Sequence, residues 1–157
     1  MPYQVRQFKD EDIKSVFAIA KWLHKNSRYK DFDLNKVKLT TLFKQSLKED
    51  SPTQLLVVTQ KQTGKVVGYF HGYVGKMYFG EDIAANDLAV VLLPKHRKEA
   101  KQVLQIIFLK FEEWAKSKGA VEITIGASTR SNGPGYNSFL NKEGYSDMGF
   151  LVEKRIR

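Results

Sequence analysis

Three strand-like segments follow one another in the middle of the chain, with no helical pattern between them. Gln54–Thr59 is a short run containing β-branched residues, and a glycine-containing turn separates it from Val66–Tyr73. The third segment, Ala84–Leu93, becomes continuously apolar in its second half. Two such segments joined by a turn predict a hairpin, and three in succession exclude the simple strand–helix alternation of a Rossmann fold. We therefore expect an α/β (α+β) fold with a mixed, largely antiparallel central sheet flanked by helices.

Helical periodicity on either side of these segments predicts the helices that cover the sheet. The strongest pattern is Lys98–Lys118, where apolar residues recur at intervals of three and four and where Gly119 is expected to end the helix. Gly68 and Gly72 are expected to mark bulges, because glycine weakens a regular strand. The remaining predicted elements are a strand at Tyr3–Arg6, a helix capped by Asp10, a helix at Leu34–Lys48, a strand at Val121–Ile125, a short helix at Pro134–Lys142 closed by Gly144, and a strand at Phe150–Val152.

One domain, residues 1–157, accounts for the sequence, because no repeat, low-complexity tract or linker divides it. The longest apolar run, Leu88–Leu93, is far shorter than the roughly 20 residues that cross a bilayer. We therefore expect a cytoplasmic protein without a membrane partner. The net charge of +9 is compatible with nucleic acid, with a polyanionic small ligand or with mere solubility, so charge alone does not decide the function.

The turn between the third central strand and the long helix is a candidate anion site, and we call residues 95–102 the basic turn. Free backbone N–H groups at a helix N-terminus carry partial positive charge and can bind an anion such as pyrophosphate. Four side chains add formal charge there, and His96 would add more if protonated: Lys95, Arg97, Lys98 and Lys101. The alternative is an ordinary strand-to-helix connection with solvated lysines.

The same segment resembles the GNAT N-acetyltransferase family. In that family a V-x-P-x-x-R/Q pattern ends a central strand, and a G-x-G-x-G/A turn then binds the pyrophosphate of coenzyme A. Here Pro94 and Arg97 match the first pattern, with Leu92 at the position of its valine. Lys98, Ala100 and Gln102 occupy the three turn positions of the second, where Ala100 matches but the glycines are missing. The resemblance implies acetyl-CoA as acyl donor, bound by the strand residues Val90, Val91 and Leu92 and by the turn residues Arg97, Lys98, Glu99, Ala100, Lys101, Gln102 and Val103.

A second GNAT signature follows the next predicted strand. Asn132 and the Gly144-Tyr145 pair lie where the resemblance requires them, and the resemblance implies that Asn132 contacts the donor. The segment around Asn86-Asp87-Leu88 is similar to that of bacteriophage and prophage members.

One position departs from the family pattern. Many members place a tyrosine four residues before the glycine, to protonate the departing thiolate. That position is Leu140 here, and leucine cannot donate a proton. Tyr136 lies one helical turn earlier on the same face, so it is a candidate for this role, with packing or pocket lining as the alternative.

Amine acetylation also needs a base that deprotonates the nucleophile. Asp87 and His71 are the candidates, and either could instead have a structural role. No metal site is expected, because the three histidines (His24, His71 and His96) are scattered and the chain has no cysteine.

The sequence thus predicts an N-acetyltransferase that transfers an acetyl group from acetyl-CoA to an amine on a small molecule or a protein, acting as a monomer or homodimer. The missing glycines and Leu140 leave an alternative open, namely a catalytically weak binding module of the same fold. Such a module would use its basic surface for nucleic acid or an acidic protein, and we do not favour it.

Overall fold

The computed structural model describes residues 1–126 and 135–156. Its elements, in chain order, are β1 (Tyr3–Gln7), the 3-10 helix η1 (Asp10–Asp12), α1 (Ile13–Lys25), α2 (Lys36–Gln45), β2 (Thr53–Gln60), β3 (Val66–Lys76), β4 (Ile83–Leu92), the 3-10 helix η2 (Pro94–Glu99), α3 (Ala100–Ser117), β5 (Ala120–Thr124) and α4 (Tyr136–Lys142). Within these residues, no helix is both long enough and apolar enough to cross a bilayer.

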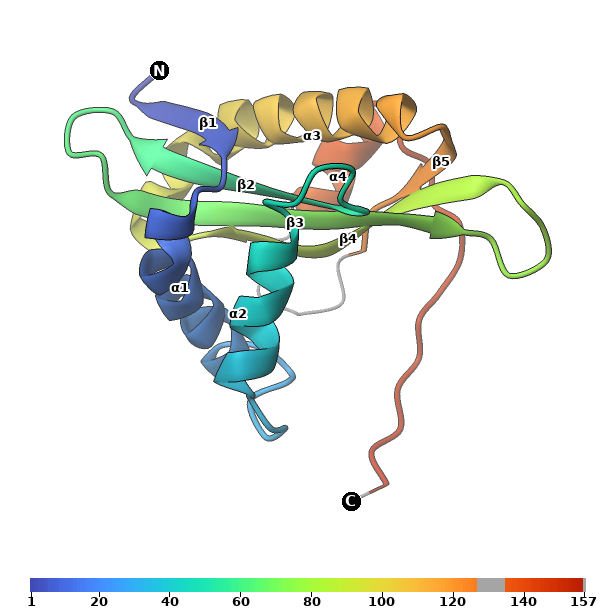
Figure 1. The fold of residues 1–157 in the computed structure, drawn as a ribbon, viewed down its shortest axis with the longest axis horizontal. Helices are drawn as coiled ribbons and strands as arrows, with labels where there is room; N and C mark the ends of the chain where they lie inside the picture. Colours follow the sequence, from blue (N-terminus) through green and yellow to red (C-terminus); the bar gives the residue numbers. More distant parts are fainter. Residues whose placement is uncertain (127–134, 157) are drawn as a thin grey trace.

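The strands form one sheet in the order β1-β2-β3-β4-β5, with α1 and α2 on one face and α3 and α4 on the other (Figure 1). Neighbouring strands are antiparallel except β4 and β5, which are parallel. The mixed, largely antiparallel sheet expected from three consecutive strands is therefore confirmed.

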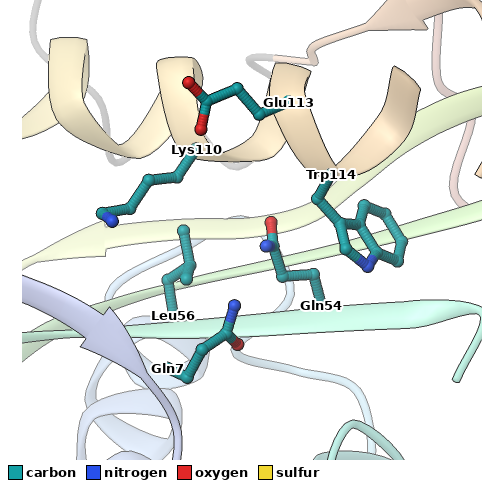
Figure 2. Close-up of a pocket in the computed structure, with 6 residues that line it drawn as sticks. All are labelled: Gln7, Gln54, Leu56, Lys110, Glu113 and Trp114. Atoms are coloured by element: carbon teal, nitrogen blue, oxygen red, sulfur yellow. The ribbon is translucent and has the colours of Figure 1, made fainter. Parts of the chain in front are cut away.

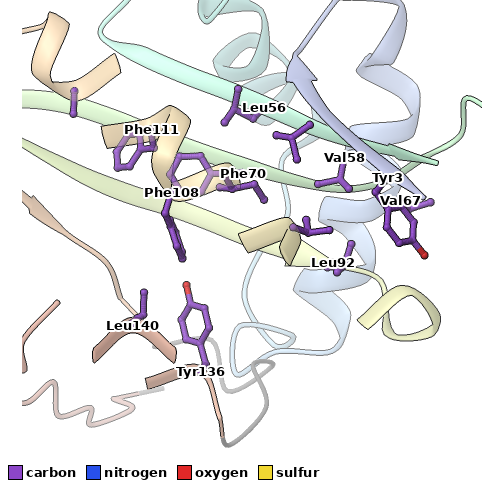
Figure 3. Close-up of a cluster of buried hydrophobic side chains, with 14 of the residues drawn as sticks. Tyr3, Leu56, Val58, Val67, Phe70, Leu92, Phe108, Phe111, Tyr136 and Leu140 are labelled. Carbon is purple, nitrogen blue, oxygen red and sulfur yellow. The ribbon is translucent and has the colours of Figure 1, made fainter. Parts of the chain in front are cut away.

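The sheet separates two hydrophobic cores, which explains why β2 is apolar on both sides. Leu56 and Val58 face α3 and pack in a core with Phe70 (Figure 3). Leu55 and Val57 point the other way, into the core beneath α1 and α2. Because successive side chains of a strand alternate between faces, a strand buried on both faces must be continuously apolar.

A bulge in β4 determines the geometry of the site described below. Gly72 pairs with Asp87, whereas the preceding His71 pairs with Ala89, so Leu88 is an extra residue without a partner in β3. The expectation that Gly72 marks a bulge is confirmed. A Cβ atom at Gly72 would lie 2.5 Å from the ring of Phe111, so only glycine lets α3 pack this closely.

Several predicted boundaries move by a few residues. Asp10 does not cap α1; the residue before that helix is Asp12, whose carboxylate accepts hydrogen bonds from Arg6 (2.7 and 2.9 Å) and from the backbone N–H of Lys9 (2.9 Å). The second helix is shorter than Leu34–Lys48 and has Asn35 as its N-cap, which accepts from the backbone N–H of Lys38.

The strand predicted at Phe150–Val152 is wrong. Residues 145–156 form no helix or strand, and the side chain of Phe150 is 99% exposed. An apolar triplet forms a strand only where a sheet edge pairs with it, but this segment instead runs toward the loop after α1. There Arg28 bonds Glu153 (2.6 Å) and Arg155 lies 3.5 Å from Asp31.

Candidate active site

A cleft opens where β4 and β5 separate. The two strands pair only from Ile83 to Asn86 on the β4 side, so in the part of the chain that is described the β5-facing edge of β4 has no strand partner after the bulge. The cleft beside this edge has a volume of about 1440 Å³. It is lined by residues 86–90 of β4, by β5, by α3 and α4, and by the C-terminal segment.

Asp87 lies where the strands separate, and its carboxylate joins β4 to the end of β5. One of its oxygens accepts a hydrogen bond from the backbone N–H of Gly126 at 2.8 Å, and the hydroxyl of Thr124 donates to the neighbouring Asn86. Burial raises the pKa of Asp87 above that of an ordinary carboxyl, although the hydrogen bond from Gly126 opposes this shift. The residue is therefore a stronger base than a solvated aspartate.

Tyr136 and Leu140 lie on the same face of α4, as their spacing predicts, and both are buried in the core beneath α3 (Figure 3). Leu140 also lines the cleft. The Tyr136 hydroxyl has no hydrogen-bond partner among the described residues. Burial, reinforced by the negative charge of Asp87, raises the pKa of Tyr136 far above its usual value. The phenol is therefore protonated and close enough to Asp87 to sense its charge.

Tyr145, which follows α4, also lines the cleft. Its ring packs on Phe108 with 6.0 Å between centroids. Burial, followed by the charges of Glu112 and Asp87, raises the pKa of Tyr145 to about 12. The Gly-Tyr pair that supports the family resemblance is the sequence signal that could have identified this residue.

His71 lies apart from Asp87. Its side chain is 3% exposed, packs on Phe43 with 5.8 Å between ring centroids, and is not among the residues that line the cleft. Burial lowers the pKa of His71 to about 4. The imidazole is therefore neutral near pH 7, and its role as a base stays a prediction.

The basic turn comprises most of η2 and the beginning of α3. Arg97 points back toward β4, where its Nε donates to the carbonyl of Leu92 at 3.0 Å. Lys98, Lys101 and Gln102 are exposed, whereas Val103 is fully buried in the core. The exposed lysines therefore supply the accessible charge of this turn.

His96 does not add charge to the basic turn. It is buried, and its Nδ1 lies 2.8 Å from the hydroxyl of Tyr3. Burial, helped by the positive charge of Lys95, lowers the pKa of His96.

The remaining predicted donor-binding residues are placed as follows. Val90 lines the cleft, whereas the side chains of Val91 and Leu92 are buried in the two cores. Glu99 and Ala100 are half-buried at the junction of η2 and α3. Asn132 lies outside the described residues.

The cleft is acidic although the protein is basic. Six carboxylates line its described part and only two basic side chains do, Arg28 and Lys116. The carboxylates belong to Asp87, Glu112, Glu122, Glu143, Asp147 and Glu153. Two are neutralised nearby, since Glu112 pairs with Lys116 at 2.9 Å and Glu153 with Arg28. The described part of the lining still has an excess of negative charge.

No family model matches the sequence, and no curated protein matches it with significant sequence similarity. Solved structures match over the whole chain at low identity. Glucosamine-6-phosphate N-acetyltransferase from Arabidopsis thaliana is 14% identical, with a TM-score of 0.71 over 100% of both chains. An aminoglycoside 6'-N-acetyltransferase from Acinetobacter haemolyticus is 13% identical, with a TM-score of 0.69 over 98% of both. A GNAT family acetyltransferase from Staphylococcus aureus is 17% identical, with a TM-score of 0.57 over 99% of this chain and 100% of the other. The chain therefore has the fold of the GNAT acetyltransferases.

Proposed function

We propose that the protein is an N-acetyltransferase that transfers the acetyl group of acetyl-CoA to an amine. The observation that carries the proposal is the edge of β4 beside Asp87, which has no strand partner among the described residues and lies at the mouth of an acidic cleft. An exposed strand edge offers backbone N–H and C=O groups in extended geometry, which suits the amide groups of a pantetheine arm.

The donor would lie along β4, with its pyrophosphate at the basic turn. Residues Val90–Leu92 would bind the arm through their backbone, because the side chains of Val91 and Leu92 are used in the cores. Lys98 and Lys101 would attract the phosphates, together with the N–H groups at the start of α3. Arg97 would hold the turn against β4 through Leu92.

Asp87 would act as the general base. An amine in the cleft loses a proton to the carboxylate, its nitrogen bonds to the acetyl carbon, and the bond from that carbon to sulfur breaks. The departing thiolate then takes up a proton. Tyr136 stays protonated and can stabilise negative charge nearby as a hydrogen-bond donor, while positioning of the two reactants supplies much of the rate.

The acidic lining favours an acceptor with more than one positive charge. The solved neighbours include enzymes named for an aminoglycoside and for glucosamine 6-phosphate. A cleft with excess carboxylates attracts a polycation and repels a sugar phosphate. We therefore propose a polyamine or a similar multi-amino compound as acceptor.

Calorimetry with acetyl-CoA, followed by thiol release in the presence of varied amines, tests the proposal. We expect saturable binding, and about tenfold weaker binding in the double variant Lys98→Glu/Lys101→Glu, because two attractive charges become repulsive. The matched control, Lys14→Glu/Lys21→Glu on α1, should bind normally. Absence of binding at millimolar acetyl-CoA would refute the proposal.

The alternative of a catalytically weak binding module keeps two supports, the missing glycines of the basic turn and the replacement of a proton donor by Leu140. It predicts salt-sensitive association with DNA or RNA and no thiol release with any amine. The likeness to phage members, the cytoplasmic location and the monomeric or homodimeric state stay predictions from the sequence.

A further inference from the structure

A second hollow lies on the sheet face that α3 covers, apart from the cleft. It has a volume of about 340 Å³ and is lined by Gln7, Gln54, Leu56, Lys110, Glu113 and Trp114 (Figure 2). None of these six residues lines the cleft. The hollow forms because β1 ends at Gln7, opposite Leu56, so β2 continues to Gln54 without a β1 neighbour.

Gln54 is polar at a position where the sheet alternation demands an apolar side chain. It shares a face of β2 with Leu56 and Val58, which are fully buried beneath α3. Gln54 itself is only 4% exposed, and its Oε1 has no hydrogen-bond partner among the described residues. Because a buried carbonyl without a partner is costly, this oxygen calls for a donor from outside the described residues.

The surroundings of Gln54 define that donor. Figure 2 shows the Gln54 side chain reaching from β2 toward α3, with Lys110 on one side and Trp114 on the other. Lys110 and Glu113 are exposed at the rim, and neither forms an ion pair within residues 1–126 and 135–156. The hollow thus combines a cation, an anion, an unpaired acceptor and an apolar wall.

We propose that this hollow binds a free α-amino acid with an uncharged side chain. The ammonium group of the ligand donates to Gln54 Oε1 and faces Glu113, while its carboxylate faces Lys110. Its side chain packs against Trp114, and no further charged residue lines the described hollow to match a charged side chain. The volume is at the lower end of the roughly 300–1,000 Å³ of small-ligand pockets, as a ligand of this size requires. The site is independent of the proposed acetyl transfer.

Trp114 provides a local probe of this site. The chain has two tryptophans, so Trp22→Phe leaves Trp114 as the sole indole emitter. Non-aromatic L-amino acids are titrated singly into this variant, up to millimolar concentration. We expect a saturable change in emission with uncharged members such as leucine or glutamine, and none with aspartate or lysine. N-acetyl-leucine lacks the ammonium and leucinamide lacks the carboxylate, so both should bind at least about tenfold more weakly.

Two further substitutions in the Trp22→Phe background test the named contacts. Gln54→Leu removes the orphan oxygen while keeping the volume, so it should bind at least about tenfold more weakly and unfold at a temperature no lower than its parent. Lys110→Ala, on the exposed surface of α3, should weaken binding without affecting folding, and Lys14→Ala on α1 should change nothing. A flat titration with every amino acid, or full affinity in both Gln54→Leu and Lys110→Ala, would overturn the proposal.

Discussion

Asp87 and His71 lie on neighbouring strands, but they face opposite sides of the sheet with opposite consequences. The side beneath α1 and α2 is closed, and His71 packs there on Phe43 without access to the cleft. The side beneath α3 and α4 opens after the β4 bulge, and Asp87 lies at that opening. Burial disfavours the charged form of both groups. It makes Asp87 a stronger base and His71 a weaker one.

The largest effect is expected from Asp87→Asn. The amide keeps an oxygen for the Gly126 N–H but cannot accept a proton from the amine, so we expect turnover to fall by about 10²–10⁴. In the wild type, activity should rise with pH through a pKa above that of an ordinary carboxyl, and this limb should disappear in the variant. Steady-state kinetics across pH measures both.

Asp82→Asn is the matched control, because Asp82 is exposed in the loop before β4. It should retain normal turnover and the normal pH profile. Unchanged turnover in Asp87→Asn would show that another group is the base.

The second expected effect is on folding stability and comes from His71, on the side of the sheet beneath α1 and α2. Burial lowers the pKa of His71 to about 4, whereas the unfolded value is 6.5. The folded state therefore binds fewer protons than the unfolded chain between these values. The free energy of unfolding is therefore highest above pH 6.5, and protonation of His71 in the unfolded chain lowers it as the pH falls toward 4, by up to about 3 kcal/mol. His71→Phe should remove this loss while preserving activity.

Urea unfolding at pH 7 and near pH 4 measures this difference, with His24→Gln as the control, because the Nε2 of His24 lies in an exposed contact 3.0 Å from the carbonyl oxygen of Phe32. An equal acid-induced loss in His71→Phe and the wild type would contradict the stability argument. Loss of activity in a folded His71→Phe would restore the catalytic role that the sequence suggested.

The sequence was sufficient to predict those elements whose structure is decided by a local pattern of residues. Period and turn residues placed the central strands and the long helix, and Gly119 ends that helix with a φ of +79° that glycine adopts without strain. The spacing of Tyr136 and Leu140 placed both on one helical face.

The remaining features depend on contacts between distant residues. No local pattern reveals that His71 faces Phe43 while Asp87 faces β5, because the extra residue Leu88 reverses the alternation of side chains along β4. The acidity of the cleft is hidden for the same reason, since its carboxylates come from separate elements of a basic chain. The apolar triplet Phe150–Val152 predicts a strand, but a strand also needs a neighbouring strand to pair with. This segment does not pair with the edge of the sheet.

The smallest effect is expected from reversing one charge in the open cleft. Glu122 is exposed on β5 and lines the cleft, so Glu122→Lys should weaken attraction for a polycationic acceptor without touching the donor. An exposed charge pair contributes about 0.2–1 kcal/mol, so we expect KM for a triamine such as spermidine to rise several-fold, with kcat and the affinity for acetyl-CoA unchanged. The KM for a monoamine should rise less, because a monoamine carries a single positive charge to interact with the carboxylates of the cleft. Glu49→Lys, at an exposed position outside the cleft, is the control. Equal KM changes for the triamine and the monoamine would show that the carboxylates of the cleft do not select the acceptor.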